Sequence, residues 1–499
     1  MIKESIFYRM LLFLANVFKK YEMSVFYNLM LKISSASGRL YTQSRFYEFF
    51  TTPSKIYKKY ETSVFYSLKE NTLNRLVSLI RIIVLSCGES VVFSKIRNSL
   101  AAKVFKFENI LTAFFVFILV IPHKYWNNLY AVIGAAVLLA VYFINIAESG
   151  EKVKFTQSVW LVVFLISIVM AMFVTPDFKD GIRIALFVFS AVIFFVLIKD
   201  GIKTKESLNR IIYGIITAFI VACVYGIYQG ITKISADSMF TDIANNKGMP
   251  GRITSMFENP NNFAEIIVLL LPFTVSMAIS SKNKTAKILC SAAFFIGIAA
   301  LLMTYTRGCY ISFVISMLVF IFMYDYRLIL PVAVILMFFM PFLPESVINR
   351  IMTIGSRQDT SSAYRIYLWE GVMKLIRKEG ITGVGLGSEA FLAAYTPFAS
   401  RFAATAPHSH MLYLELFIEM GVLGGVSFFA FMISSLRKGF AVFNKTDKET
   451  RCVIIAAISA FMGIAFSAAT EYIWFYPRVM FVFWIVLGIL LCSVKLQKK

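Results

Sequence analysis

The sequence predicts an all-α polytopic membrane protein with about 12 transmembrane helices, and three observations lead to this fold class. First, 59% of the 499 residues are hydrophobic and the mean hydropathy is +0.73, whereas a soluble domain has about 45–50% apolar residues. Second, 50 Phe stand against only 28 Asp plus Glu. Third, the apolar residues form runs long enough to cross a membrane. These observations exclude a single water-soluble enzyme and a disordered chain.

The first 104 residues form a separate basic segment, which we expect to be cytoplasmic or to lie at the membrane interface. Residues 1–106 carry 17 Lys and Arg against 6 Asp and Glu, which is half of the net charge of +22. The stretch Phe18–Leu29 recurs as Tyr57–Leu68, an internal repeat with an offset of 39 residues. Its mixed aromatic and basic residues favour amphipathic helices on an anionic membrane surface, with a docking platform for another protein as the alternative. The apolar run Val77–Cys87 is too short to span a membrane.

Residues 105–499 form the predicted membrane domain. Twelve candidate spans lie at about 105–122, 128–147, 157–175, 182–199, 208–230, 262–281, 285–304, 308–324, 328–343, 411–435, 452–470 and 474–493. Between the ninth and tenth spans, residues 344–410 form a large polar loop.

The distribution of Lys and Arg predicts the orientation of these spans. The basic residues gather on the side of the N-terminal segment, in Lys199, Lys203, Lys205, Arg210, Lys282, Lys284, Lys287, Arg437, Lys438, Lys445, Lys448, Arg451, Lys495, Lys498 and Lys499. By the positive-inside rule this side is cytoplasmic, and an even number of spans returns the C-terminus to it. We therefore expect a multi-pass protein with both termini in the cytoplasm and with loops 231–261 and 344–410 outside.

Two of the three histidines stand at the end of the large outer loop, directly before the tenth span. These are His408 and His410, whereas His123 sits in a short interfacial turn. Within the span, Glu415 and Glu419 are four residues apart and therefore share one helical face. Two carboxylates in a membrane helix should face protein or water, because exposing charge to lipid is costly. A polar seam at the start of a helix is the alternative to a catalytic role.

Three arginines lie in the predicted outer loops, where they do not contribute to topology. Arg252, Arg307 and Arg365 each carry a planar guanidinium that can donate two parallel hydrogen bonds to a phosphate. One such arginine could anchor a lipid headgroup, but three beside a histidine pair favour a phosphate site. In Gly383–Gly387 glycine occupies alternate positions, and we expect a turn that allows close backbone approach rather than a nucleotide loop. The six cysteines form no CxxC pair, so neither a zinc site nor a disulfide framework is predicted.

The order of these motifs resembles the O-antigen ligase and polymerase superfamily. Along the chain the motifs are Arg252 with Phe257-x-Asn259-Pro260-Asn261, then Thr306-Arg307-Gly308, Arg365 with Trp369, Gly383-x-Gly385-x-Gly387, and His408-x-His410 followed by Leu414, Glu415, Glu419 and Gly421. Each motif alone is weak, but their order, the topology and the long loop before the histidines make the resemblance specific. It covers about residues 105–495. The family's histidine is usually followed by Asn, where this chain has Met411.

The resemblance implies a metal-independent membrane glycosyltransferase that needs no cofactor. Its donor would be a glycan on undecaprenyl pyrophosphate at the outer face of the bacterial cell membrane, and its acceptor a sugar hydroxyl on another glycan or on a lipid. His410 would be the general base, because an unperturbed imidazole titrates near neutral pH, and His408 or Glu415 would orient it. The other implied site residues are Arg252, Arg307 and Arg365 for the pyrophosphate, with Asn259, Asn261, Trp369 and Glu419 in support. Membrane lipids and other proteins of polysaccharide assembly are further expected partners, and nucleic acid is not.

Three other functions remain open at the level of the sequence. A polyprenyl-phosphate-sugar glycosyltransferase would need an acidic residue in the first outer loop, which is 122–127 and has none. A lipid-linked glycan flippase would be expected to have two related halves, which are not seen, and would leave the long outer loop unexplained. A scaffold anchored by the N-terminal repeat would leave the histidine pair without a role. Within the resemblance, polymerase and ligase are not distinguished.

Overall fold

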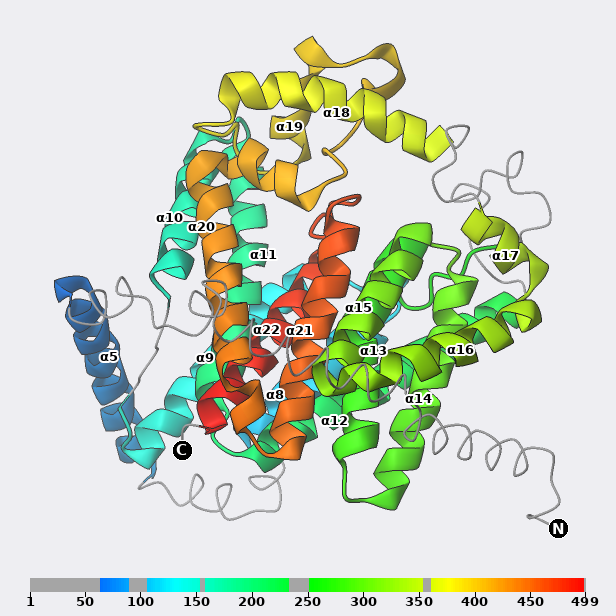
Figure 1. Ribbon diagram of the computed structural model, residues 1–499. Helices are drawn as coiled ribbons and strands as arrows, with labels where there is room; N and C mark the ends of the chain where they lie inside the picture. The colour runs from blue at the N-terminus through cyan, green and yellow to red at the C-terminus, as the bar shows by residue number, and fades with distance from the viewer. Residues whose placement is uncertain (1–62, 89–105, 153–157, 233–250, 353–359, 498–499) are drawn as a thin grey trace, which may run out of the picture.

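The computed structural model describes residues 63–88, 106–152, 158–232, 251–352 and 360–497, and every regular element within these ranges is a helix (Figure 1). Nine helical stretches there are long and apolar enough to cross a membrane: α9 (Leu129–Ser149), α11 (Phe178–Val196, extended to Gly201), α12 (Lys205–Thr232), α13 (Pro260–Ser280), α14 (Lys284–Met303), the stretch Arg307–Phe342, α20 (Leu412–Val442, extended to Lys445), α21 (Lys448–Ala468) and α22 (Pro477–Gln497). Two shorter apolar helices join them, α8 (Phe107–Val120) and α10 (Val159–Val174). The all-α polytopic prediction is confirmed, whereas the count of twelve long spans is corrected.

Of the three long spans by which the count differs, two correspond to the shorter helices α8 and α10, and the third is lost where the predicted eighth and ninth spans are joined into one helical stretch. α15 (Arg307–Asp325) leads through the 3₁₀ turn Tyr326–Leu328 into α16 (Ile329–Phe339), with no loop between them. The Asp325 carboxylate accepts hydrogen bonds from the backbone and guanidinium of Arg327, which stabilises this tight turn. With 11 residues, α16 is only about 16 Å long, too short to cross a bilayer core by itself.

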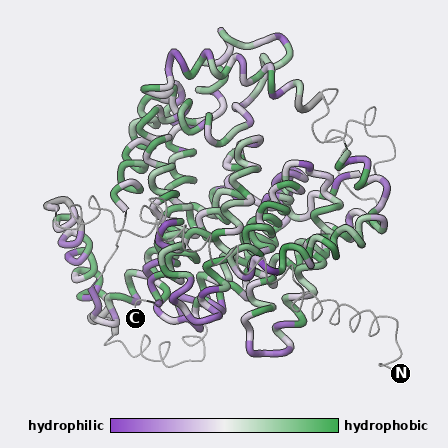
Figure 2. The backbone as a smooth tube through the Cα atoms, in the orientation of Figure 1, coloured by the Kyte–Doolittle hydropathy of each residue, from purple (hydrophilic) through white to green (hydrophobic). Residues whose placement is uncertain are grey.

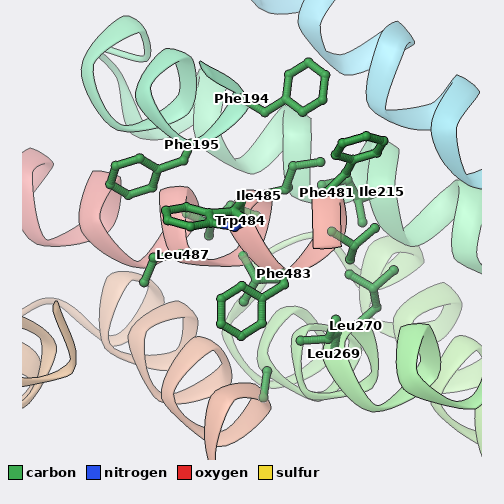
Figure 3. Close-up of a cluster of buried hydrophobic side chains, with 14 of the residues drawn as sticks. Phe194, Phe195, Ile215, Leu269, Leu270, Phe481, Phe483, Trp484, Ile485 and Leu487 are labelled. Atoms are coloured by element: carbon green, nitrogen blue, oxygen red, sulfur yellow. The ribbon is translucent and has the colours of Figure 1, made fainter. Parts of the chain in front are cut away.

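A single helix, α22, forms the centre of the bundle. In its apolar window 94% of the residues are buried, which is the largest share among the nine candidate spans. Figure 3 shows Phe481, Phe483 and Trp484 of α22 packed among apolar side chains of neighbouring helices, including Phe194 and Phe195 of α11. The Trp484 indole stacks on Phe431 and meets Phe195 edge to face, geometries that aromatic pairs prefer. The helices that carry the loops of the site are therefore held against a rigid core.

The loops predicted to be cytoplasmic lie together at one end of the bundle. The Lys495 ammonium contacts the backbone carbonyl of Lys199 and the carboxylate of Asp200, and Lys205 pairs with Asp447. At the other end, buried Arg478 at the start of α22 donates to carbonyl oxygens at the end of α8. The first and last apolar helices therefore run in opposite directions. Figure 2 shows the hydrophobic middle of the bundle between more hydrophilic ends.

The segment predicted as the large outer loop forms a helical cap at the end of the bundle opposite the basic loops (Figure 1). The cap contains α18 (Thr360–Glu379) and α19 (Ser388–Tyr395), whereas α17 (Glu345–Met352) of the same segment lies apart from them, against the turn before α15. Its small core holds Leu368, Val372, Leu375, Phe391, Tyr395, Ala403 and Ala406, and it reaches Ile418 of α20. Because this core is continuous with a span, the cap is fixed rigidly above the bundle.

Little of the N-terminal segment belongs to the described residues. The first copy of the repeat, Phe18–Leu29, and the first half of the second lie outside them. The helix α5 (Val64–Gly88) begins in the second copy and packs on α9 through Val77. It is 25 residues long but is not among the nine stretches that could span. The membrane-surface and docking roles of this segment therefore stay predictions.

A cysteine at Ser388 is expected to react with a membrane-impermeant thiol reagent in intact cells. The prediction follows from the basic loops at the opposite end of the bundle, which the positive-inside rule assigns to the cytoplasm. Asn444→Cys, at an exposed position near those loops, is the matched control and should be labelled only after lysis. The reverse pattern of labelling would invert the topology.

Candidate functional site at the cap of the bundle

The histidine segment is held between the cap and α20 by hydrogen bonds to the residue between the two histidines. The Ser409 backbone N–H donates to the Glu415 carboxylate at 2.7 Å, and the indole N–H of Trp369 donates to the Ser409 carbonyl at 2.9 Å. His410 has a φ of 51°, a left-handed conformation that is uncommon for residues other than glycine. Such strain persists only where the surroundings enforce it, and it clusters at functional sites.

His410 pairs with an acidic residue that sequence reasoning did not select. Its Nδ1 lies 2.7 Å from Oε1 of Glu471, in the turn between α21 and α22. The other carboxylate oxygen, Oε2, accepts a hydrogen bond of 2.8 Å from the Arg365 guanidinium. Burial alone would raise the pKa of Glu471, but the hydrogen bond from His410 and the charges of His410 and Arg365 outweigh it and lower this pKa to about 2. Glu471 is therefore an ionised anchor shared by a histidine and an arginine.

His408 contacts the backbone of His410 rather than a carboxylate. Its Nδ1 accepts a hydrogen bond of 3.1 Å from the backbone N–H of His410, and the two ring centroids are 4.2 Å apart. The ring is 5% exposed and packs on Phe475. Burial, followed by the charge of His410, lowers the pKa of His408 to about 3. His408 is therefore neutral at physiological pH, with its proton on Nε2 because Nδ1 is an acceptor.

The two carboxylates of α20 hold loops rather than touching His410. Glu415 accepts from Ser409, while Glu419 accepts from the Gly387 backbone N–H at 3.0 Å and from the Tyr472 hydroxyl at 3.2 Å. Both side chains are buried and face protein, as expected from the cost of charge in lipid. The orienting contact with His410 that we expected from Glu415 or His408 is made at Nδ1 by Glu471.

The glycine motif is a close backbone crossing, as the sequence suggested. Gly383, Gly385 and Gly387 all have positive φ, of 79°, 101° and 95°. A Cβ on Gly385 would come within 2.6 Å of the backbone of Thr175 at the end of α10, and one on Gly383 would meet the backbone of α20. The crossing lies at Gly421, where α20 is kinked with a φ of 65°. The motif thus fastens the cap to α10 and α20.

Gly385→Ala is expected to lower the melting temperature of the detergent-solubilised protein markedly. The side chain would add strain at a positive φ, which costs about 1–3 kcal/mol, and would clash with the Thr175 backbone, which cannot move aside as a flexible side chain can. Gly308→Ala is the matched control, because the nearest atom there is 3.5 Å from the added Cβ. Equal melting temperatures for the two variants would contradict the close crossing.

Arg252 is buried at the edge of the cap, beneath the turn that joins α14 to α15. Its guanidinium donates to the Thr304 carbonyl at 2.8 Å, to the Asn261 side chain at 2.7 Å and to the Thr306 hydroxyl at 2.9 Å. Asn259 caps the start of α13, since its side chain accepts from the Asn261 backbone N–H. The two asparagines therefore position Arg252.

Two further arginines lie near Arg252. Burial, followed by the nearby charges of Arg350 and Arg307, lowers the pKa of Arg252 to about 10, so it stays charged at neutral pH. Arg350 of α17 donates to the carbonyl of Tyr305, whose φ of 52° is also strained. The Tyr305 hydroxyl in turn contacts Ser346. The turn before α15 thus gathers three guanidinium groups.

The arginine turn and the histidine pair are joined through the segment between α21 and α22. Gly308 faces Thr470, which directly precedes Glu471, and the Leu412 N–H donates to the Glu471 carbonyl. Arg365 does not belong to this group of arginines, because it pairs with Glu471. The structure therefore brings Arg252 and Arg307 together and adds Arg350 to them.

One cluster among the described residues has a geometry compatible with a metal ion. His408, His410 and Glu471 each offer a ligand atom within 4.8 Å of the other two. The same atoms have other uses, because Glu471 pairs with Arg365 and the Nδ1 of His408 accepts a backbone N–H. A cationic guanidinium beside the carboxylate opposes a bound cation. Metal independence stays a prediction that a chelator can test.

Sequence reasoning missed Glu471 and Arg350, and little in the sequence could have indicated either. Glu471 lies in a short turn between two apolar helices, where an acidic residue by itself does not indicate a function. Arg350 stands in an amphipathic stretch directly after an apolar helix, a position that equally suits a headgroup anchor. Glu471 lies 61 residues along the chain from its partner His410, and Arg350 lies 45 residues from its partner Tyr305.

Comparison with protein families matches residues 292–429 to the family described as O-antigen ligase. The matched segment runs from α14 into α20 and contains Arg307, Arg350, Arg365 and both histidines, whereas Arg252 and Glu471 lie outside it. Comparison with curated proteins finds no match to the chain. Together with the nine long apolar stretches among the described residues, the match indicates a multi-pass helical membrane protein in which residues 292–429 are similar to the O-antigen ligase family.

Proposed function

We propose that the protein transfers a glycan from undecaprenyl pyrophosphate to a sugar hydroxyl at the outer face of the bacterial cell membrane. The O-antigen ligase domain implies membrane glycan transfer of the ligase or polymerase type. The observation that carries the residue assignment is the contact between His410 Nδ1 and Glu471. An ionised carboxylate at Nδ1 favours the tautomer with its proton on that nitrogen and leaves the Nε2 lone pair basic. His410 is thus arranged as a general base.

In the proposed reaction, Nε2 of His410 takes the proton of the acceptor hydroxyl. The acceptor oxygen forms a bond to the anomeric carbon of the donor glycan, and the bond from that carbon to the pyrophosphate oxygen breaks. Its electron pair leaves with the pyrophosphate, which departs on the lipid. Glu471 stabilises the imidazolium that forms, and Arg365 keeps the carboxylate in place. His408 holds the backbone N–H of His410 and so helps to fix its strained conformation.

The leaving pyrophosphate is proposed to bind at Arg307, with Arg252 and Arg350 beside it. Negative charge grows on this group as the bond to the sugar breaks, and fixed guanidinium groups stabilise such charge in a water-poor site. Arg307 begins α15, so the positive end of the helix dipole adds to its charge. In this assignment Arg350 takes the place that was expected for Arg365. Arg365 instead pairs with Glu471, the partner of the base.

Arg307→Lys is expected to raise the KM for the lipid-linked donor and to reduce transfer by at least tenfold. Lysine keeps the charge but cannot donate the two parallel hydrogen bonds of a guanidinium to one phosphate. Arg327→Lys, in the turn at the far end of α15, is the matched control and should retain activity. Transfer of labelled lipid-linked glycan in vesicles measures both variants, and wild-type activity of Arg307→Lys would contradict a bidentate contact.

Polymerase and ligase activities use the same site and differ in their acceptor. Cells that lack the gene should distinguish them: single repeat units left on the lipid indicate a polymerase, whereas long chains left on the lipid indicate a ligase. A flippase would instead leave the lipid-linked glycan on the cytoplasmic leaflet. The hydrogen bond between His410 and Glu471 favours transfer over transport, because transport requires no group that removes a hydroxyl proton.

A further inference from the structure

A cavity of about 640 Å³ opens beside His408. It is bounded by α11, α19, the start of α20 and the turn before α22, and its lining includes Tyr472 and Phe475. None of the four arginines assigned above lines it. Its volume lies within the range of about 300–1,000 Å³ typical of small-molecule sites. The proposed pyrophosphate site does not account for this space.

The position of the cavity relates it directly to the proposed base. Phe475 lies 4.3 Å from the ring of His408, and that ring lies 4.2 Å from the ring of His410, measured between centroids. His408 thus lies between the cavity and His410, whose ring meets Tyr364 of α18 edge to face. A group seated in the cavity therefore lies next to the histidine pair.

The lining of the cavity is acidic and aromatic. Its charged members are the carboxylates of Asp180, Glu389, Glu415 and Glu419 and the guanidinium of Arg183. Arg183 forms an ion pair with Asp180, and Glu389 adds an exposed carboxylate to the lining. An ionised carboxylate accepts hydrogen bonds from hydroxyl and ammonium groups and repels anions, which disfavours phosphate and uronate. The faces of Phe187 and Phe475 offer apolar surface for a sugar ring.

We propose that this cavity binds the terminal sugar of the acceptor glycan, and that this sugar is neutral or carries an amine. The inference rests on the proposed function, because it places the acceptor on one side of the histidine pair and the donor pyrophosphate on the other. The separation of an acidic pocket from an arginine turn keeps the pyrophosphate out of the acceptor site. The cavity sets the acceptor sugar beside His408, whose ring is next to that of the base.

Protection of a cysteine in the cavity tests this proposal on the full chain in lipid vesicles. Ser388 lines the cavity, whereas exposed Thr405 does not. Each is replaced by cysteine in a Cys87→Ser background, and the five other cysteines are buried. The probes are the benzyl glycosides of glucose, glucosamine and glucuronic acid at about 10 mM, since ligands of this size bind in the millimolar range or somewhat tighter.

The glucose and glucosamine probes are expected to slow thiol labelling of Ser388→Cys several-fold, and the glucuronic acid probe to slow it far less. Labelling of Thr405→Cys should not change. The proposal is overturned if no probe protects Ser388→Cys, if the glucuronic acid probe protects equally well, or if Thr405→Cys is protected to the same extent.

A substitution that fills the cavity provides a second test of the proposal. Val188 is buried and lines the cavity, while Leu186 on the same helix is 41% exposed and does not line it. Val188→Trp should abolish protection of Ser388→Cys, and Leu186→Trp should leave it intact. Protection that survives Val188→Trp in a protein of normal size-exclusion profile would place the sugar elsewhere.

Release of undecaprenyl pyrophosphate from lipid-linked glycan, measured in the same vesicles, separates this inference from the proposed function. Release without protection of Ser388→Cys refutes the acceptor cavity and leaves the transfer reaction in place. Protection without release retains a sugar-binding cavity and refutes the transfer reaction.

Discussion

Replacing His410 by alanine is expected to reduce glycan transfer by about 10²–10⁴-fold, the usual contribution of a positioned general base. The substitution removes the only basic nitrogen that the proposed reaction uses. It leaves the arginine turn in place, so binding of the lipid-linked donor should persist. The measurement is the conversion of purified lipid-linked glycan by the protein in vesicles, with EDTA present so that a metal ion cannot substitute for the base.

His408→Ala is the matched control for this prediction. Because the pKa of His408 is lowered to about 3 by burial and by the charge of His410, the ring stays neutral, and its Nδ1 is occupied by a backbone N–H. We therefore expect a smaller loss of activity, caused by a looser His410. An inactive His408→Ala with a fully active His410→Ala would move the base to His408. Full activity of the double variant would refute the base mechanism while leaving glycan transfer in place.

Glu471→Gln is expected to produce a loss nearly as large as that of His410→Ala. An amide can donate its N–H to Nδ1, which would place the imidazole proton on Nε2 and remove the lone pair that accepts the hydroxyl proton. In a histidine–carboxylate pair such an exchange can lower kcat by up to about 10⁴-fold. Glu471→Asp keeps the charge with a shorter reach and should retain more activity. Wild-type kcat in Glu471→Gln would exclude Glu471 as the partner of the base.

The pH dependence of stability gives an independent measure of the same carboxylate. Its folded pKa of about 2 lies below the ordinary value of 4.5 for a glutamate, so pairing with His410 and Arg365 contributes stability that is complete above about pH 4.5. This stability is lost as the pH falls toward 2, because the unfolded chain then binds the proton more readily. The melting temperature of the wild type should therefore fall more steeply over this range than that of Glu471→Gln.

The positions of spans and loops in the membrane domain could be predicted from the sequence, because they follow from local patterns. Apolar runs and clusters of Lys and Arg predict spans and loops without knowledge of contacts. For the same reason the histidine pair could be placed at the start of α20, with Glu415 and Glu419 on one helical face. The predicted spans 308–324 and 328–343 correspond to α15 and α16, but α16 is shorter than predicted and follows α15 through a 3₁₀ turn held by Asp325 and Arg327.

The partners within the site were decided only by the tertiary structure. Glu471 reaches His410 across 61 residues and Arg365 across 106, and its own turn contains no motif that indicates either contact. These contacts exist because α20, α21 and α22 pack around one core and bring their ends to the same face. The sequence by itself determined that the protein is a helical membrane protein and which motifs lie together at one end of it, because hydrophobicity and spacing are local properties. Packing alone decided which carboxylate meets the histidine, which arginines converge and where a cavity remains, because these depend on the distance between residues far apart along the chain.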